Sequence, residues 1–431
     1  MLRTIRPSAL PLFVLLAVGC ASAGARPATS ASPADAAARA TSAAVPTRAK
    51  AVSLAEAPKN WQLLDEAADG IAGVSSERAM RELLANRKPE RVVLVAVIDG
   101  GIDTLHADLR ANLWTNPREQ PNGKDDDGNG HVDDMHGWNF IGNRNGRNLD
   151  HETSELTRLY AGCVKLAPRG DVAALPEPDG ARCRKFATDF SKKAAEAKAE
   201  LAAVTQAAAV LKQVTMMLRS ALKTETLTRA NVDAFQPTDA RARQARDVFL
   251  GMLASGIDSV AVADARTAYQ SRVDFGFNVN YDGRSIVGDD PKNLRETNYG
   301  NADVMGPDAK HGTHVSGIIG AVRGNKIGID GIAPSVKIMM VRTVPDGDER
   351  DKDVANAIRY AVDNGAQIIN MSFGKGYSPD KQVVDEAVQY ADAHNVLMVH
   401  AAGNDGQNND TESNFPSAAY ASSAHAERWI E

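Results

Sequence analysis

The sequence contains few cysteines, few aromatic residues and no long run of like charge. Three of its 431 residues are cysteine, and phenylalanine, tryptophan and tyrosine together make up 5%. The formal net charge of −6 is spread along the chain, so a nucleic-acid partner has no electrostatic support. With 43% hydrophobic and 24% charged residues, the composition is that of a globular protein. The length suits two or three domains, or one large domain with insertions.

The chain opens with an export signal that is too short to span a bilayer comfortably. Arg3 and Arg6 precede an apolar core at residues 10–19, which is typical of a secretory signal peptide over residues 1–20. Ala-Val-Gly-Cys, ending at Cys20, resembles a bacterial lipobox and predicts a lipidated Cys20 and a membrane-anchored lipoprotein of a bacterial envelope. Ala-Ser-Ala at 21–23 offers ordinary cleavage instead, which predicts a periplasmic or secreted protein. Residues 21–50, rich in Ala, Pro and Ser, have almost nothing to bury, and we expect a disordered tether.

Cys163 and Cys183 are the cysteines that remain after processing. Export to an oxidising compartment favours a disulfide between them, and the alternative is a pair of free surface thiols. In the chain-entropy model a loop of this length contributes about 3 kcal/mol to stability.

Near-continuous apolar runs predict four buried strands, at residues 91–101, 335–344, 367–374 and 396–404. Helices are expected at 76–88, 353–366 and 381–395. Strands that alternate with helices of this length form βαβ units. The sequence therefore predicts an α/β fold with a mostly parallel sheet flanked by helices.

Residues 151–275 interrupt this alternation with two helical stretches, at 189–223 and 238–269. One apolar face of the first stretch contains Leu201, Val204, Ala208, Leu211, Leu218 and Leu222. We expect a helical insertion that can be removed without losing the sheet. The α/β domain would then comprise residues 51–150 and, on the other side of the insertion, residues 276–431.

Two polar residues, Asp99 and His311, lie at positions where catalytic residues are common in α/β folds. Asp99 ends the first strand, and the carboxyl edge of an open α/β sheet is where catalytic groups collect. His311 opens a helix whose small residues suit close packing against a sheet. Each residue alone has a structural alternative, a turn cap for Asp99 and a hydrogen-bonded core histidine for His311. We interpret His314 as a buried structural histidine.

Four short segments, in this order, resemble the subtilisin-like serine proteases, or subtilases. They are "VIDGGIDTLHADL" at 97–109, "HGTHVSGIIGA" at 311–321, "NMSFG" at 370–374 and "AAGND" at 401–405. The resemblance covers residues 91–141 and 274–420, and subtilase catalytic residues follow the order Asp, His, Ser. It implies a subtilisin-like fold and a serine endopeptidase that acts on protein or peptide substrates without an organic cofactor.

The resemblance also implies roles for individual residues. Asp99 matches the triad aspartate, which orients the imidazole, and His311 matches the triad histidine, which serves as general base. Asn404 matches the asparagine that donates to the oxyanion. Ser372 and Gly374 match the segment that walls the primary specificity pocket and pairs with the substrate backbone.

The family's nucleophile has no counterpart in these 431 residues. Subtilases carry it in a "GTSMA"-like segment, and no Gly-Thr-Ser occurs in the sequence. Ser422 and Ser423, after the family-like "NFPSAAY", lack the flanking Gly-Thr and the following helix, and "RWIE" is similar to the lead into the family's next strand. We expect the sequence to end within the domain, so that it supplies base, orienter and oxyanion donor but not the serine. The alternative is an inactive truncated subtilase that only binds peptides.

An acidic segment at 125–134, "DDDGNGHVDD", is a candidate Ca²⁺ site. Asp125, Asp127 and Asn129 alternate before a glycine, as at the start of an EF-hand loop. The position of the bidentate glutamate holds His136, so Asp133 is a candidate to complete the site. The alternative is a solvated turn.

The resemblance implies a second Ca²⁺ site that pairs Asp108 with Asn325. Zinc catalysis is the rival chemistry, since His311 and His314 are three residues apart. However, the sequence has no His-Glu-x-x-His pattern and no glutamate beside this pair.

Overall fold

The computed structural model describes residues 57–404 and 406–431. The predicted signal peptide, Cys20 and the tether lie outside the described residues. Six strands form one sheet in the order β2-β3-β1-β4-β5-β6, with parallel neighbours throughout. The strands are β1 (Val93–Asp99), β2 (Gly137–Asn139), β3 (Val336–Arg342), β4 (Ile368–Met371), β5 (Leu397–His400) and β6 (Trp429–Ile430). The predicted α/β fold is confirmed.

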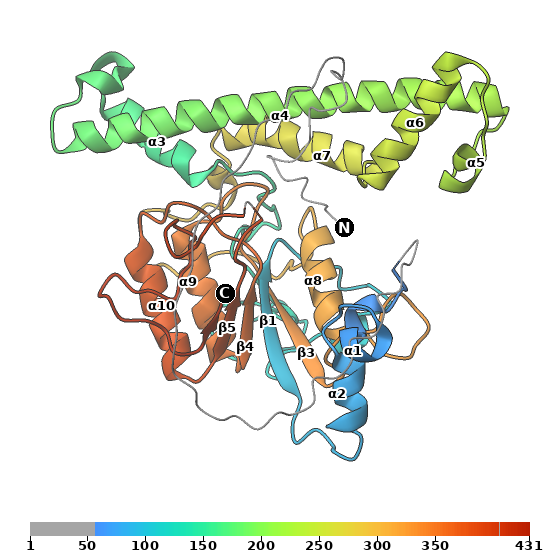
Figure 1. Ribbon diagram of the computed structural model, residues 1–431. Coiled ribbons are helices and arrows are strands. Elements are labelled where there is room, and N and C mark those ends of the chain that lie inside the picture. Colours follow the sequence, from blue (N-terminus) through green and yellow to red (C-terminus); the bar gives the residue numbers. More distant parts are fainter. Residues whose placement is uncertain (1–56, 405) are drawn as a thin grey trace, which may run out of the picture. The chain divides into compact units, whose positions relative to one another are not determined.

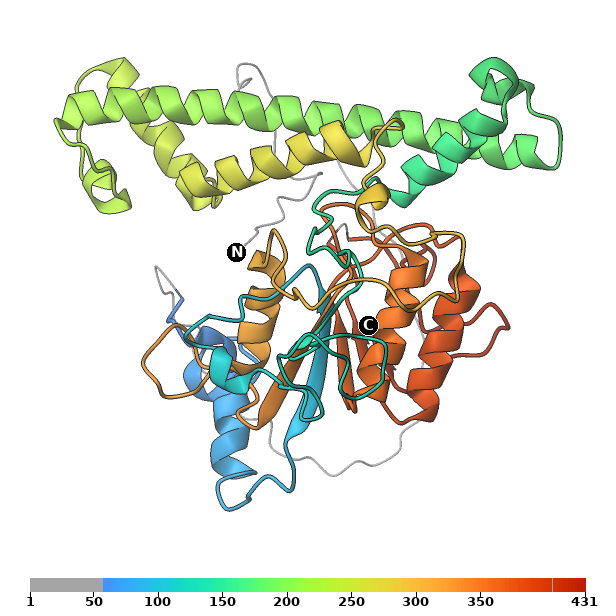
Figure 2. The ribbon, with the colours of Figure 1, turned by 180° about the vertical axis from the view of Figure 1, so that it is seen from behind.

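Helices cover both faces of the sheet. Ala96 and Ile98 of β1 belong to a buried cluster with α9 (Asp351–Asp363) and α10 (Lys381–Ala393), whereas Val95 and Val97 pack with α8 (Lys310–Gly320). Side chains of a strand point alternately to opposite faces, so α9 and α10 lie on one face and α8 on the other (Figures 1 and 2). Burial on both faces explains why the strands are near-continuous apolar runs in the sequence.

The two edge strands are short. β2 has only three residues, which are too few to stand out as an apolar run, so it could not be predicted from the sequence. Gly137 opens β2 with φ at 129°, and a Cβ there would lie 1.7 Å from the carbonyl oxygen of Met340. Only glycine permits so close an approach of the two strands. β6 lies within the "RWIE" segment that is similar to the lead into a strand.

A group of helices occupies residues 155–276. It comprises α3 (Glu155–Leu166), α4 (Asp179–Leu222), α5 (Arg229–Asp233), α6 (Ala240–Ala254), α7 (Ser259–Ser271) and a π-helical turn (Arg272–Gly276). Figure 1 shows α7 beside α4. One face of α4 packs against α6 and α7 in a buried cluster that includes Val204, Leu211, Leu218, Phe249, Val262 and Tyr269. By length and composition alone α4 would also pass for a membrane span, a property that it shares with core helices of soluble proteins.

The second predicted helical stretch, 238–269, is broken between α6 and α7. Gly256 follows α6 with φ at 72°, a left-handed conformation in which glycine is unstrained. Asp258 caps α7, because its carboxylate accepts hydrogen bonds from the backbone N–H groups of Val260 (2.9 Å) and Ala261 (2.8 Å). The break bends the chain by 66° between α6 and the segment that begins with α7.

The base of the helical group is attached to the sheet domain. A disulfide between Cys163 and Cys183, with Cα atoms 5.5 Å apart, joins α3 to α4. Both cysteines lie in a buried cluster on which Tyr377, from the loop after β4, also packs. Glu155, the first residue of α3, is buried and pairs with the buried Lys375. Removing residues 151–275 would leave Lys375 without this partner, so the expectation of a clean removal is revised.

Residues 57–89 form a compact unit of their own, so the range 51–150 is not a single unit. This unit contains a 3₁₀ turn (Trp61–Leu63), α1 (Glu66–Asp69) and α2 (Ser76–Glu82). Asp65 caps α1 by accepting from the backbone N–H of Ala68 at 2.8 Å, and Gly70 ends the helix in the left-handed conformation.

Candidate active site

Asp99 and His311 meet at the carboxyl edge of the sheet. His311 Nδ1 lies 2.9 Å from both carboxylate oxygens of Asp99. Asp99, the last residue of β1, is 3% exposed, whereas the His311 side chain, in the first turn of α8, is 46% exposed. A carboxylate only accepts hydrogen bonds, so Nδ1 carries the proton and donates. Nε2 is then the ring nitrogen that remains free to act as a base.

The hydrogen bond to Asp99 raises the pKa of His311 above its ordinary value. Partial burial of the ring opposes this shift, and the negative charges of Asp99 and Asp308 reinforce it. The site therefore stabilises the imidazolium, the species that forms when a histidine base takes up a proton.

Glycines allow α8 to approach the end of β1. A Cβ on Gly312 would lie 2.1 Å from the carbonyl oxygen of Gly101 and 3.3 Å from Cβ of Asp99. The next residue, Thr313, accepts a hydrogen bond from the backbone N–H of Asp103 through its hydroxyl oxygen, at 2.8 Å. The glycine-rich opening of the helix thus fixes the imidazole against the carboxylate.

Arg342 supports the loop that follows Asp99, and no motif in the sequence identifies it. It ends β3, pairs in register with Asp99, and is 2% exposed. Its guanidinium donates to the carbonyl oxygens of Gly100 (2.7 Å) and Leu149 (2.6 Å) and to Oδ1 of Asn139 (3.1 Å). Burial lowers the pKa of Arg342 to about 10. The only signal in the sequence is an arginine at the end of an apolar run.

His314 is exposed, so its interpretation as a buried structural histidine is wrong. The buried residues of α8 are Gly312, Ser316 and Gly320, which recur every four residues and form the face toward the sheet. Two residues on from Gly312 the helix has turned by about 200°, so the side chain of His314 points away from that face.

Adjacent parallel strands place the other candidate residues at the same edge. β4 is followed by Ser372 and Gly374, and β5 is followed by the segment that contains Asn404. Ser372 Oγ accepts from Nδ2 of Asn370 at 2.9 Å, while Gly374 and Asn404 are exposed. A Cβ on Gly374 would lie 2.3 Å from Oδ1 of Asn414, so a side chain there would require Asn414 to move.

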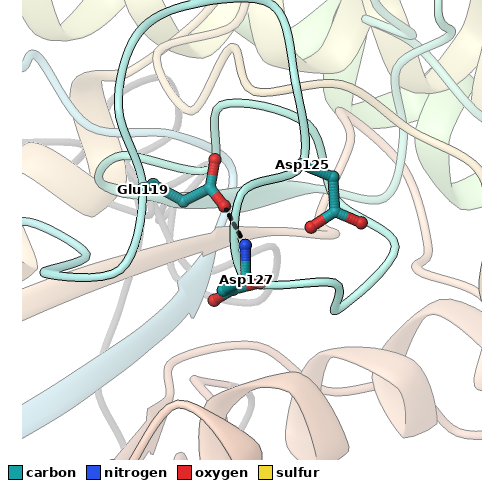
Figure 3. A group of neighbouring side chains, drawn as sticks. All are labelled: Glu119, Asp125 and Asp127. Carbon is teal, nitrogen blue, oxygen red and sulfur yellow. Dashed lines mark hydrogen bonds between the residues drawn. The ribbon is translucent and has the colours of Figure 1, made fainter.

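Glu119, Asp125 and Asp127 form an acidic group in the segment before β2 (Figure 3). One ligand atom from each lies within 4.8 Å of the others. Glu119 is 1% exposed, and its Oε1 accepts from the backbone N–H groups of Asp126 (2.8 Å) and Asp127 (3.0 Å). Within the described residues, its Oε2 is buried without a hydrogen-bond partner.

This acidic group fits a Ca²⁺ ion. A buried carboxylate oxygen without a partner is unfavourable, and Ca²⁺ takes oxygen ligands of this kind. Sequence reasoning missed Glu119 because it lies outside the EF-hand spacing. The residue could have been found only by noting an acidic residue shortly before the loop.

Asp133 is not part of the acidic group, which corrects its place in the predicted site. Its carboxylate accepts instead from the backbone N–H groups of Asn122 (2.9 Å) and Gly123 (3.0 Å). Asn129 lies close to the group, but its Nδ2 donates to Oδ2 of Asp134 at 3.0 Å. Burial raises the pKa of Asp134 to about 6.

Asp108 and Asn325 lie together, as expected, but each oxygen of Asp108 has a protein donor. Asn325 Nδ2 donates to Oδ1 at 2.7 Å, and the backbone N–H of Ile329 donates to Oδ2 at 3.1 Å. Asp108 is 2% exposed. Since the amide nitrogen of Asn325 faces the carboxylate, this arrangement is satisfied without an ion.

Comparisons with known proteins agree with this geometry. The model of the subtilase family matches residues 245–426, which include His311, Ser372 and Asn404 but not Asp99. Over 117 residues the chain is 41% identical to thermitase from Thermoactinomyces vulgaris, covering 27% of this chain and 39% of thermitase. It is also 41% identical over 116 residues to the minor extracellular protease Epr of Bacillus subtilis (strain 168), covering 27% of this chain and 17% of that protein.

A solved structure of the prenylagaramide maturation protease PagA is 33% identical over 25% of this chain and 39% of its own, with a TM-score of 0.22. The chain thus spans well under two thirds of the length of these relatives. Asp99 lies outside the residues that the family model matches. It contacts the matched residues through its hydrogen bond with His311. By the match of the family model to residues 245–426 and by these identities, this part of the chain is similar to the subtilase family.

Proposed function

We propose that the protein is a serine endopeptidase in which His311 is the general base and Asp99 is its partner. The observation that carries the proposal is the 2.9 Å hydrogen bond between His311 Nδ1 and the buried Asp99. A buried carboxylate behind a half-exposed imidazole is an arrangement that activates a hydroxyl nucleophile. The relatives named above are proteases, which supports the same activity.

In the proposed reaction His311 Nε2 takes the proton of a serine hydroxyl while its oxygen bonds to the carbonyl carbon of the substrate. Asp99 holds the Nδ1 proton and stabilises the imidazolium. The side-chain amide of Asn404 donates to the carbonyl oxygen as it becomes an anion, a contribution of about 3–4 kcal/mol. The imidazolium protonates the leaving amine, and a water activated by the same imidazole then hydrolyses the acyl-enzyme.

The proposed substrates are proteins or peptides that bind as an extended strand. Ser372 and Gly374 follow β4 at the edge where Asp99 ends β1. Backbone groups of such a segment pair with a substrate strand regardless of its side chains, and a neighbouring pocket supplies specificity.

Peptide binding without cleavage is the second candidate function. The observation that favours it is the lack of a Gly-Thr-Ser segment in the 431 residues. A chain with base, orienter and oxyanion donor but no nucleophile would retain binding and lose covalent catalysis.

The test compares the 431-residue chain with the longest product of the same reading frame. We expect the 431-residue chain to leave casein uncut and to resist a serine-directed fluorophosphonate, and a longer product with a Gly-Thr-Ser segment to cut and to be labelled. Strong labelling of the shorter chain would show that it holds its own nucleophile. If no product of the frame cuts casein while peptides still bind, the second candidate function replaces the first.

The active product allows a matched test of the two histidines. His311→Ala should lower kcat/KM by a factor of about 1,000 or more, because the base is lost. His314→Ala removes an exposed histidine from the same helix and should leave kcat/KM unchanged. Equal effects of the two changes would contradict the proposed role of His311.

We also propose that Glu119, Asp125 and Asp127 bind Ca²⁺, with Asn129 beside them. The support is the spacing of the carboxylates and the unpartnered buried Oε2 of Glu119 among the described residues. A bound divalent cation would offset the mutual repulsion of the three carboxylates and would hold the loop before β2. Its role is therefore in stability, away from the Asp99–His311 pair.

We further propose an exported protein that is anchored to a bacterial membrane only through a lipid on Cys20. The signal pattern of residues 1–20 supports export, and one relative is named an extracellular protease. Labelling of the protein by an alkyne-tagged fatty acid in the producing cell, and loss of label in Cys20→Ala, would test the anchor. A labelled Cys20→Ala variant would place the lipid elsewhere.

A further inference from the structure

Helix α7 is attached near its middle to the helix that carries His311. Asp264 Oδ2 lies 2.8 Å from Nζ of Lys310, the residue directly before His311. This contact places the middle of α7 beside the first turn of α8, which carries His311.

The C-terminal end of α7 is attached to the loop that contains His151. Ser271 Oγ lies 3.2 Å from Nδ1 of His151, and Ser271 is 6% exposed. In the π-helical turn that follows, the ring of Phe275 stacks on that of His151, with centroids 4.1 Å apart and planes 6° apart. The end of α7 is therefore fixed by both a polar and an aromatic contact.

The loop of His151 is in turn bonded to the segment that follows β3. Glu152 N donates to the carbonyl oxygen of Asp346 at 2.9 Å, and Asp346 N donates to that of Asp150 at 2.8 Å. Two residues before Asp346, the backbone N–H of Val344 donates to the carbonyl oxygen of Asp99 at 3.3 Å. A chain of direct contacts thus leads from the end of α7 to Asp99.

The distance that α7 covers between its two attachments is short. At 1.5 Å per residue, the segment from Asp264 to Ser271 is about 10 Å long. Arg272, in the turn that follows α7, pairs with Glu200 of α4 at 2.8 Å, and this ion pair holds the end of α7 against α4. α4 is held to the sheet domain through Asp189, which accepts from the hydroxyl of Tyr377 at 2.6 Å. These contacts hold the segment from Asp264 to Ser271 at both ends, and we call this segment of α7 the strap.

We infer that α7 restricts the site to extended, unfolded polypeptide and excludes scissile bonds on tight loops of folded proteins. The inference rests on the proposed peptidase or peptide-binding function of the Asp99–His311 edge. An extended strand needs about 5 Å laterally and about 10 Å across its side chains. A folded domain of 100 residues has a radius of gyration of about 13 Å, so its body collides with a strap about 10 Å long that is attached on both sides of the site.

Two variants release the strap. Asp264→Lys sets two like charges against each other at Lys310, and because that ion pair is partly exposed its loss costs little stability. The matched control is Asp247→Lys in α6, where the exposed aspartate pairs with its own neighbour Arg246 at 2.9 Å. A second variant replaces residues 203–266 with a short Gly-Ser linker, which removes the Asp264 attachment but keeps α3 and the disulfide.

The probe is the ten-residue casein peptide that binds the 431-residue chain best in a fluorescence anisotropy screen. The same ten residues are also placed in a long Gly-Ser linker and, separately, in a short surface loop of a small folded domain. In the unaltered chain we expect equal Kd values for the peptide and the linker form, and a Kd at least tenfold higher for the loop form. Both strap variants should reduce this difference, and Asp247→Lys should not.

Equal binding of loop and linker forms by the unaltered chain would overturn the inference and leave the proposed function intact. A tenfold difference that survives in both strap variants would overturn it as well, because the exclusion would then have another source. If no casein peptide binds the 431-residue chain in the screen, peptide binding by this chain is contradicted and the inference fails with it, whereas cleavage by a longer product is tested separately.

Discussion

Lys375 Nζ lies 2.9 Å from Oε2 of Glu155, and the two side chains are 2% and 7% exposed. Glu155 is the first residue of α3, and Lys375 directly follows the Ser372–Gly374 segment. The same ammonium lies 2.8 Å from Oδ1 of Asp351 and donates to the carbonyl oxygen of Glu349 at 2.7 Å. The helical group is therefore bonded to the segment that we propose pairs with substrate.

Replacing Lys375 with methionine should be strongly destabilising. The change leaves the buried carboxylate of Asp351 without this cation, while Glu155 keeps its ion pair with Arg158 at 2.6 Å. Breaking a buried pair in this way costs about 3–5 kcal/mol. Urea unfolding measures the loss. Lys185→Met is the matched control, since Lys185 pairs with Asp189 on the surface of α4 and its loss costs about 1 kcal/mol or less. A small effect of both changes would show that the Lys375 pair adds no stability.

Neutralising Glu349 should stabilise the protein at high pH. Burial raises the pKa of Glu349 from an ordinary 4.5 to about 7, and one of its oxygens has no hydrogen-bond partner within the described residues. The folded protein keeps a proton that the unfolded chain releases, so the contribution of Glu349 is present below pH 4.5 and is lost as the pH rises through 7. Glu349→Gln stays neutral and should gain up to about 3 kcal/mol over the original protein between pH 5 and pH 8.

The control for this pH dependence is Glu412→Gln, which changes an exposed glutamate. Its free energy of unfolding should follow that of the original protein at every pH. A gain in Glu349→Gln that is the same at pH 5 and pH 8 would show that Glu349 does not titrate in this range.

The sequence predicts the sheet well because burial on two faces leaves a strong local signal. The runs at 91–101 and 335–344 contain β1 and β3, and their ends place Asp99 at the carboxyl edge. The Asp99–His311 contact could be predicted because short motifs identify both residues. β2 could not, since three residues carry no periodicity and its place depends on Gly137.

Contacts between distant segments account for the features that the sequence could not reveal. Glu155 and Lys375 are 220 positions apart, and each alone is an ordinary surface charge in sequence. The role of Glu119 depends on how the loop folds its backbone N–H groups onto Oε1. The position of His314 could have been predicted, because the spacing of the small residues Gly312, Ser316 and Gly320 marks the buried side of the helix.

The titration of His311 should depend on Asp99. The hydrogen bond from His311 to this carboxylate raises the pKa of the imidazole, so its NMR titration midpoint should lie above 6.5. The stabilising contribution of the protonated ring is present below pH 6.5 and is lost as the pH rises through the folded pKa. Asp99→Asn should lower the midpoint, and an unchanged midpoint would contradict the pairing. In an active product, turnover should rise with pH through the same value because the base must be neutral.

Ca²⁺ should raise the melting temperature through Glu119, Asp125 and Asp127. A ligand that binds only the folded state adds about 2.7 kcal/mol at a hundredfold excess over its Kd. The rise should disappear in Asp125→Ala/Asp127→Ala and in Glu119→Gln, which keeps the size of the side chain and removes its charge. Asp126→Asn is the control within the same loop, because its carboxylate accepts from Gln120 N and Asn122 Nδ2 instead of joining the acidic group. If Glu119→Gln kept the full rise while Asp125→Ala/Asp127→Ala lost it, the ion would bind the exposed loop alone. The unpartnered Oε2 of Glu119 would then lower the stability of the folded protein and would not bind the ion.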